Sequence, residues 1–215
     1  MRAKLEKGST LIKSIDAKLK THAKLKLINQ CDIFLPTSRR MQEVYYPDVA
    51  TKIHVLPSAI DPSRVHSKVC RDDEKIVFAY IGMLSKLRNF ELILAAFNSL
   101  KNDNWELIIS TVYDVYAQNS IEDFVNIKDK IKIVKSDTKD ELLDVIANCY
   151  VGIVLLPDID IFSTSIPLKI IDYYTSGIPA LISNNELHNT VFQDNKDAWL
   201  CIRSVYNRNT FFIEL

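Results

Sequence analysis

Apolar and polar positions along the chain alternate with two periods, one typical of strands and one typical of helices. Short apolar runs bounded by polar residues predict strands at residues 76–81, 106–110, 130–134, 151–155, 180–182 and 198–202. Apolar residues three or four positions apart predict helices between them, at residues 91–100, 115–125, 139–147 and 168–176, and residues 184–197 leave room for another short helix. Apolar strands that alternate with helices predict an α/β domain whose Rossmann-like, doubly wound parallel sheet is covered on both faces.

The beginning of the chain has a different pattern. A long amphipathic helix is predicted at residues 9–29, followed by a β-α-β unit with strands at residues 33–36 and 53–56 and a helix at residues 38–46. The polar stretch 66–74 is typical of a linker. We therefore divide the chain into a first part, residues 1–65, and a main domain, residues 66–215.

Composition and charge limit the kinds of function to be expected of this chain. The chain has 215 residues with 27 Lys plus Arg and 27 Asp plus Glu, so its net charge gives no reason to expect a nucleic-acid partner. Its apolar runs are shorter than the roughly 20 residues that span a bilayer, and its start lacks the apolar core of a signal peptide. The four cysteines are scattered without a CxxC pair, which indicates reduced cysteines in a cytoplasmic protein and no zinc site. The basic residues within 1–26 suit either an anionic membrane surface or a solvated helix face.

The stretch 165–179 carries the strongest local signal. Pro167 stands where the first turn of a helix tolerates proline, Gly177 stands where a helix ends, and Pro179 prevents continuation. The free N–H groups of a helix start favour an anion, and Asp172 lies on the same helix face as Lys169. This helix could therefore present N–H groups to a phosphate and a carboxylate to hydroxyls. A capped helix without any ligand would show the same pattern.

Two loops follow strands at the predicted carboxyl edge of the sheet, where ligands of such folds bind. The loop after residues 76–81 contains Gly82, Lys86 and Arg88, whose cations could neutralise a diphosphate or could simply face solvent. The loop after residues 151–155 offers hydroxyls and N–H groups, and its Asp158 and Asp160 form a D-x-D pair that is common by chance. The chain has no GxGxxG fingerprint, so binding of NAD by that route is not expected.

These motifs together resemble the donor-binding domain of GT-B glycosyltransferases of the family 4, or group 1, type. Family members carry a Pro, a Glu and Gly-x-Pro at the spacing of Pro167, Asp172 and Gly177 here, and a second Glu where this chain has Thr164. The first loop of the family commonly has Arg, Lys and Gly where this chain has Met83, Arg88 and Asn89. The resemblance implies that Asp172 binds the ribose. It implies donor contacts by Gly82, Lys86, Arg88, Thr164, Ser165, Ile166, Pro167, Lys169 and Asp172.

The resemblance covers about residues 30–200, because residues 31–65 also look like the junction between the two domains of the family. It implies that residues 1–65 are a remnant of the N-terminal acceptor domain, with apolar surface left exposed, and that residues 66–215 are a donor domain truncated at its C-terminus. No catalytic residue is identified.

The implied activity is retaining transfer of a sugar from a nucleotide-diphosphate sugar to a glycan or lipid-linked acceptor in polysaccharide biosynthesis. It needs no metal and no other cofactor, and it takes place in the cytoplasm or at the inner membrane face. We expect the isolated chain to be inactive without a partner chain that supplies the missing domain. The alternatives are a non-catalytic nucleotide-sugar-binding or interaction module, the remnant of a split gene, and a GT-B nucleotide-sugar epimerase.

Overall fold

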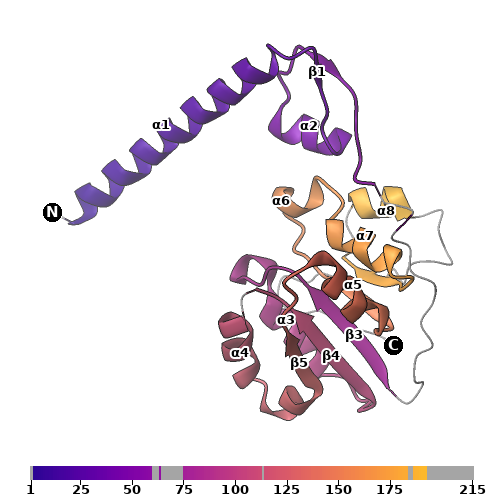
Figure 1. The fold of residues 1–215 in the computed structure, drawn as a ribbon. Helices are drawn as coiled ribbons and strands as arrows, with labels where there is room; N and C mark the ends of the chain where they lie inside the picture. The colour runs from indigo at the N-terminus through magenta and orange to yellow at the C-terminus, as the bar shows by residue number, and fades with distance from the viewer. Residues whose placement is uncertain (1, 60–62, 64–74, 113, 184–185, 193–215) are drawn as a thin grey trace. The chain divides into compact units, whose positions relative to one another are not determined.

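The computed structural model describes residues 2–59, 63, 75–112, 114–183 and 186–192, and these belong to two compact units (Figure 1). Unit 1 is Met1–Pro57 and unit 2 is Ser58–Leu215. The predicted domain boundary at residues 65 and 66, the predicted linker at residues 66–74 and the predicted strand at residues 198–202 lie outside the described residues. We describe each unit by itself.

Unit 1 consists of a long helix and a small β-α-β unit. Its elements are α1 (Arg2–Ile28), β1 (Ile33–Phe34), α2 (Arg39–Tyr45) and β2 (Lys52–Ile53). The two strands pair in parallel, and Ser38 caps α2 by accepting a hydrogen bond from the N–H of Met41 at 2.9 Å. Helix α1 begins seven residues earlier than the predicted range 9–29, because that range rested on apolar spacing while the helical backbone extends through a polar start.

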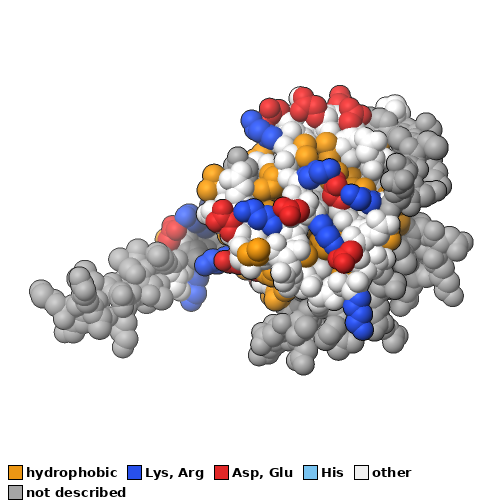
Figure 2. Space-filling model, turned by 90° about the horizontal axis from the view of Figure 1, so that it is seen from below, with side chains coloured by type: hydrophobic (Ala, Val, Ile, Leu, Met, Phe, Trp, Pro, Cys, Tyr) orange, Lys and Arg blue, Asp and Glu red, His pale blue; other side chains and the backbone are white. Residues whose placement is uncertain are grey.

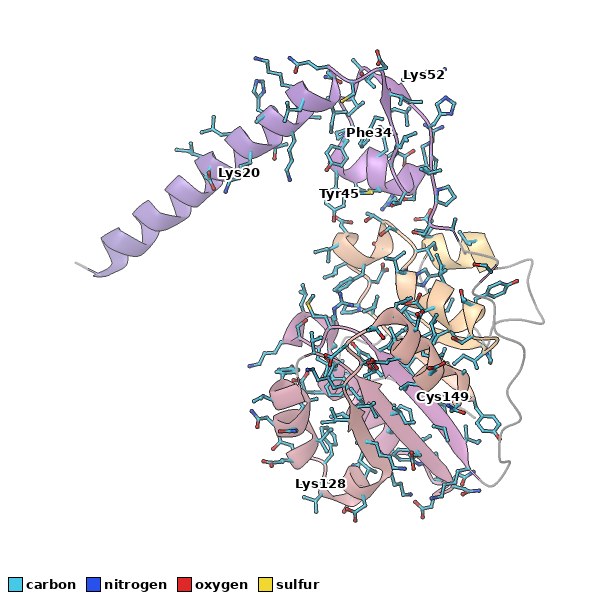
Figure 3. All side chains as sticks on the ribbon, viewed as in Figure 1. Lys20, Phe34, Tyr45, Lys52, Lys128 and Cys149 are labelled. Atoms are coloured by element: carbon cyan, nitrogen blue, oxygen red, sulfur yellow. The ribbon has the colours of Figure 1, made fainter. Side chains whose placement is uncertain are left out.

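The small sheet of unit 1 leaves apolar side chains exposed. Along and after its strands, Ile33 is 40% exposed, Leu35 47%, Val55 42% and Leu56 59%. Figure 3 shows the side chains of this unit, with Phe34 and Tyr45 labelled beside helix α2 and the strands. A parallel pair of two-residue strands buries little on its own, since parallel sheets are normally covered on both faces. The predicted exposure of apolar surface in this part of the chain is therefore present.

Unit 2 is built on a five-stranded sheet in the order β5-β4-β3-β6-β7, and every neighbouring pair is parallel. The strands are β3 (Ile76–Ile81), β4 (Trp105–Ser110), β5 (Ile131–Val134), β6 (Val151–Val154) and β7 (Ala180–Ile182). The order reverses at β3 and β6, because the chain moves outward on one side through β4 and β5 and then returns to start β6 beside β3. A crevice beyond the strand ends at such a reversal is where α/β folds bind ligands.

Helices cover both faces of the sheet, which confirms the doubly wound prediction. The helical elements are η2 (Lys86–Arg88), α3 (Phe90–Asn98), α4 (Asp114–Glu122), η3 (Val125–Lys130), α5 (Lys139–Ala147), α6 (Asp160–Ser163), α7 (Leu168–Thr175) and α8 (Glu186–Phe192). Alternate strand residues point to opposite faces. One core therefore packs Phe78 and Leu107 against α3 and α4, and the other packs Ala79 and Val154 against α5 and α7.

The central strands separate toward their carboxyl ends. The pairing of β3 with β6 is confined to Phe78 with Val151 and Ala79 with Gly152. Beyond that point the hydroxyl of Tyr173, on α7, accepts a hydrogen bond from the N–H of Ile81 at 3.2 Å and lies 2.8 Å from the carbonyl oxygen of Ala79. The Tyr173 side chain thus takes the place of a strand-to-strand connection and holds the two strands apart.

Gly152 makes room for this ring. A Cβ atom at Gly152 would lie 2.2 Å from Cδ2 of Tyr173, which is far inside van der Waals contact. A glycine within a strand often marks such a close approach. Because α7 is fixed to the sheet here, the side chains one turn before Tyr173 on α7 are placed at the opening between β3 and β6.

The charged surface of unit 2 is mixed. On the face shown in Figure 2, Lys and Arg side chains are interspersed with Asp and Glu. Ion pairs of this unit include Lys132 with Glu106 at 2.8 Å and Lys135 with Asp137 at 3.0 Å. Among the described residues, no helix is both long and apolar enough to cross a membrane.

Candidate functional site

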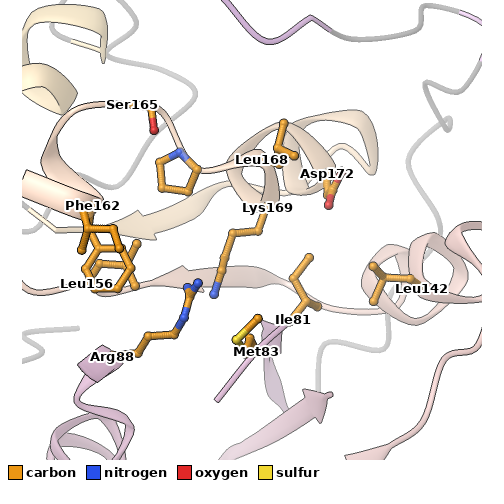
Figure 4. Close-up of a pocket in the computed structure, with 13 residues that line it drawn as sticks. Ile81, Met83, Arg88, Leu142, Leu156, Phe162, Ser165, Leu168, Lys169 and Asp172 are labelled. Carbon is orange, nitrogen blue, oxygen red and sulfur yellow. The ribbon is translucent and has the colours of Figure 1, made fainter. Parts of the chain in front are cut away.

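A cavity of about 490 Å³ opens where β3 and β6 separate, at the reversal of strand order (Figure 4). Its walls come from the end of β3 and the loop after it, from the loop and short helix after β6, from the start of α7 and from α5. The residues that line it are Ile81, Gly82, Met83, Arg88, Leu142, Leu156, Ile161, Phe162, Ser165, Pro167, Leu168, Lys169 and Asp172. Both loops that the sequence singled out therefore contribute to one site.

The loop after β3 needs two unusual backbone conformations. Gly82 has φ +97°, and a Cβ atom added to it would meet nothing within 4 Å, so it is the backbone conformation rather than lack of space that favours glycine. Asn89 has φ 52° at the start of α3, a left-handed conformation that Asn tolerates better than most residues. This explains why Asn can stand where the group 1 pattern has Gly. Between these two residues, Arg88 extends into the cavity with its guanidinium 5.1 Å from the ring centroid of Phe162.

Lys169 is the most unusual residue of the site. Its side chain is only 9% exposed, and its Nζ has no hydrogen-bond partner within the described part of the chain. The Nζ lies 4.2 Å from the ring centroid of Tyr80, a cation–π contact. Helix α7 covers one face of the sheet while the Tyr80 ring belongs to the core of the other, so Lys169 reaches Tyr80 through the gap between β3 and β6. Figure 4 shows its ammonium end and the guanidinium of Arg88 directed into the same space.

The electrostatics follow from this geometry. Burial, and to a smaller extent the positive charge of Arg88, together lower the pKa of Lys169 from 10.5 to about 7. Burial also raises the pKa of Tyr80 to about 12, so its hydroxyl stays neutral and donates to the carbonyl oxygen of Met83 at 3.2 Å. Arg88 and Lys169 therefore share one cavity, and among the described residues neither forms an ion pair with a carboxylate, since the Asp172 carboxylate in the same lining is paired with Lys139. This arrangement favours an anion.

Asp172 lies on the rim, one turn after Lys169. Its carboxylate forms an ion pair with Lys139, at the start of α5, and its side chain is 16% exposed. Thr138 caps α5, since its hydroxyl accepts a hydrogen bond from the N–H of Glu141 at 3.2 Å. The Glu141 carboxylate accepts from the N–H of Asp137 at 2.9 Å, one residue before the cap position. The pairing with Lys139 holds Asp172 at the cavity edge and leaves its remaining oxygen lone pairs available for hydroxyl donors.

The structure brings together six of the nine predicted donor contacts. Gly82, Arg88, Ser165, Pro167, Lys169 and Asp172 all line the cavity. Lys86 is exposed on η2, Thr164 is buried at 2% exposure, and Ile166 packs against the core beneath α7, so these three are not among its lining residues. Both loops singled out by sequence spacing line this cavity, but spacing could not say which side of each loop faces inward.

Seven lining residues were not predicted. All seven are apolar, namely Ile81, Met83, Leu142, Leu156, Ile161, Phe162 and Leu168. The short helix α6, which positions Phe162, falls in a segment predicted to be a loop, because four residues are too few for a periodic signal. Among the residues that the structure describes, no group of three or more His, Cys, Asp and Glu side chains could hold a metal ion.

The comparison of the sequence with protein families decides what kind of domain this is. The sequence model of the family described as glycosyl transferases group 1 matches residues 63–207, which is more than half of the chain. The chain belongs to this family. The resemblance noted in the sequence is thus confirmed, and the matched range contains every residue that lines the cavity. Among curated proteins, none matches the sequence.

Solved structures of other proteins share the fold. The chain is similar to HepE from Anabaena in complex with UDP and glucose, with a TM-score of 0.62 and 10% identity over 89% of this chain and 52% of that one. It is similar to a glycosyltransferase from Rickettsia africae, with a TM-score of 0.59 and 11% identity over 75% of this chain and 48% of that one.

A third example is the lipopolysaccharide outer core galactosyltransferase WaaB, with a TM-score of 0.52 and 19% identity over 71% of this chain and 43% of that one. The chain thus spans about half the length of these structures. These similarities, together with the parallel sheet of unit 2, show that the chain has the Rossmann-like fold of GT-B enzymes over the part that it covers.

Proposed function

We propose that unit 2 binds the nucleotide-diphosphate sugar donor of a glycosyl transfer reaction. The observation that supports this most directly is the convergence of Arg88 and the buried Lys169 in one cavity at the switch in strand order. Two cations can neutralise the two negative charges of a diphosphate ester, and the planar guanidinium can bind two of its oxygens at once. The apolar wall near Leu142 and Leu168 suits the less polar faces of a nucleoside.

Asp172 is placed for the ribose in this proposal. It lies on the same helix as Lys169, one turn farther along, so a ligand whose diphosphate meets Lys169 can bring neighbouring hydroxyls to the rim. A carboxylate there accepts hydrogen bonds from two adjacent hydroxyls. The ion pair with Lys139 fixes the carboxylate in advance, which lowers the cost of ordering it when the donor binds.

The complete reaction that we propose is retaining transfer to a glycan or lipid-linked acceptor, in the biosynthesis of a surface polysaccharide at the cytoplasmic face of a membrane. Support comes from membership of the group 1 family. The basic stretch of α1 provides a membrane contact in this proposal, because Lys18, Lys20, Lys24 and Lys26 are all exposed. Pelleting with anionic vesicles should retain the chain at low salt and release it at high salt.

The acceptor side requires a second contribution, since the chain spans about half the length of its structural relatives. We propose that residues 1–65 belong to the acceptor domain and its junction and that a partner chain completes it. The exposed apolar side chains of β1, β2 and the residues that follow them support this. Transfer needs the acceptor at bonding distance and water excluded, which the donor cavity alone does not provide. The isolated chain should bind donor without appreciable transfer, and as such it would act as a nucleotide-sugar-binding module.

Calorimetry with UDP-sugars and GDP-sugars tests donor binding. Arg88→Ala should weaken binding about 10- to 100-fold, as expected for losing a hydrogen bond to a charged group, and the remaining affinity should depend less on salt. Asp172→Ala should cost about 1–3 kcal/mol of binding free energy. Lys128→Ala is the matched control, because Lys128 is an exposed cation on η3, at the far end of unit 2 from α7 in Figure 3. Absence of binding at millimolar concentrations of all these sugars would contradict the proposed function.

A further inference from the structure

The surroundings of Lys169 do not favour a charged ammonium group. Its Nζ is buried, has no hydrogen-bond acceptor within the described residues, and shares the cavity with the guanidinium of Arg88. The ring of Tyr80 at 4.2 Å compensates for only part of the lost hydration. A neutral amine in the empty cavity avoids both the desolvation of a charge and the repulsion by Arg88.

Among the residues that the structure describes, the charged groups around Lys169 offer no alternative counter-ion. From β3 it faces Tyr80, which stays neutral, and from η2 it faces Arg88. Asp172 of its own helix is paired with Lys139 of α5. Asp158 and Asp160, on the segment after β6, are exposed and are not among the lining residues.

A bound diphosphate would change this balance. It brings two negative charges and several acceptor oxygens to the space where Lys169 and Arg88 converge, and an opposite charge close by favours the protonated amine. Binding that favours a protonated form takes up a proton wherever the free form is neutral. The Lys169 amine would then carry the positive charge usual for lysine only in the complex.

We propose that the cavity of unit 2 is a proton-linked anion site, in which binding of a diphosphate ester is coupled to protonation of Lys169. The consequence is that donor affinity falls as pH rises through neutrality, although neither phosphate of a nucleotide-diphosphate sugar titrates there. This inference rests on the proposed donor binding and adds a regulation to the same site. It makes occupancy of the site sensitive to pH over the physiological range.

The size of the effect follows from a pKa of about 7 in the free protein. At pH 8 about nine in ten molecules would carry a neutral Lys169, so binding should take up about 0.9 proton per donor. Affinity should be about tenfold weaker at pH 8 than at pH 6, with most of the change on the alkaline side.

The test is calorimetry of the 215-residue chain with UDP-glucose at pH 8 in HEPES and in Tris, whose ionisation enthalpies differ. The difference in apparent binding enthalpy gives the number of protons taken up. UDP-glucose is the suitable probe because both of its phosphates are esterified, whereas the terminal phosphate of UDP has a pKa near 6, as a phosphomonoester does. Uptake of about 0.9 proton is the expected result.

Lys169→Arg is the decisive variant, because Arg keeps the charge but stays protonated at every pH used. It should bind UDP-glucose with no proton uptake and with affinity that is flat between pH 6 and pH 8. The Lys128→Ala control should keep the uptake of the wild type. The other titratable groups of the chain, its four histidines among them, remain in every variant, so uptake that persists in Lys169→Arg would come from one of these groups and would overturn the proposal.

A second measurement tests the proposal without the Lys169→Arg variant, in case the larger Arg side chain does not fit the cavity. In the ¹³C spectrum of the wild type, one Lys Cε resonance should titrate near neutrality, should be missing in Lys169→Met, and should move to a pKa well above 8 with UDP-glucose. Binding of UDP-glucose with no proton uptake, or with no such resonance, would overturn the proton linkage and leave the proposed function standing. Failure to bind any nucleotide-sugar would overturn both.

Discussion

The hydroxyl of Tyr173 provides a sharp test of how unit 2 is held together. The side chain is fully buried, and its hydroxyl accepts from the N–H of Ile81 while lying within hydrogen-bond distance of the carbonyl oxygens of Ala79, at 2.8 Å, and Ile153, at 3.4 Å. Tyr173→Phe keeps the ring that fills the space above Gly152 and removes only this polar bridge. One buried N–H and one buried carbonyl lose a partner at the point where β3 and β6 separate.

The magnitude follows from these contacts. An unsatisfied buried polar group costs about 1–3 kcal/mol, so we expect Tyr173→Phe to lower the free energy of unfolding of unit 2 by roughly 2–4 kcal/mol. For a domain of this size the melting temperature should fall by roughly 5–15 °C. Urea unfolding followed by tryptophan fluorescence, to which the buried Trp105 contributes, measures the change.

The neighbouring Tyr174→Phe is the matched control. Tyr174 lies on the same helix but is 49% exposed, so its variant should change the free energy of unfolding by less than about 0.5 kcal/mol. If Tyr173→Phe were as stable as this control, the hydroxyl would not be bridging the strands and the reasoning about the separation of β3 and β6 would be wrong.

Three further predictions concern the same unit. Gly152→Ala should destabilise it by more than about 3 kcal/mol, since the new Cβ overlaps the Tyr173 ring, and denaturant unfolding would check this. Because Asn89 has a positive φ, Asn89→Ala should lower the free energy of unfolding by about 1 kcal/mol, while Asn89→Gly should leave it unchanged or raise it. Thermal melts in which both variants lose the same stability would contradict this. The pKa of Lys169 is about 7 in the folded protein and 10.5 in the unfolded chain. Between these two pH values the unfolded chain binds more protons, so the free energy of unfolding of the wild type should rise as pH rises from 7 toward 10. Lys169→Met should remove that rise and should stabilise the domain at pH 6 by up to about 5 kcal/mol. The check is urea unfolding of both proteins at a series of pH values, and the same pH dependence of the free energy of unfolding in both would refute the prediction.

The sequence predicted the layers of unit 2 well because its signals are local. The bounds of β3, α5 and β7 agree with the predicted ranges, since each is an apolar run or a capped amphipathic segment with clear ends. Helix α8 fills the stretch where a short helix was considered. Helix α6 was missed, because a single turn of helix leaves no periodic pattern.

The candidate site was less predictable, because its main features depend on contacts between distant segments. The burial of Lys169 results from the gap between β3 and β6, and no spacing within α7 reveals that gap. The exposed position of Lys86 and the buried position of Thr164 depend on how two loops turn. One signal was available, since Gly152 within a strand indicates a close approach by another side chain.

The position of the Tyr173 side chain between β3 and β6 has a consequence for the kinetics of ligand binding. Because a core side chain keeps β3 and β6 apart, the opening between them exists before any ligand arrives and requires no separate opening step. Association should therefore follow a single exponential whose rate rises linearly with ligand concentration, without the plateau that a slow conformational step imposes. The attraction of Arg88 for an incoming anion should make that rate fall with ionic strength, while departure of the ligand should depend on salt much less.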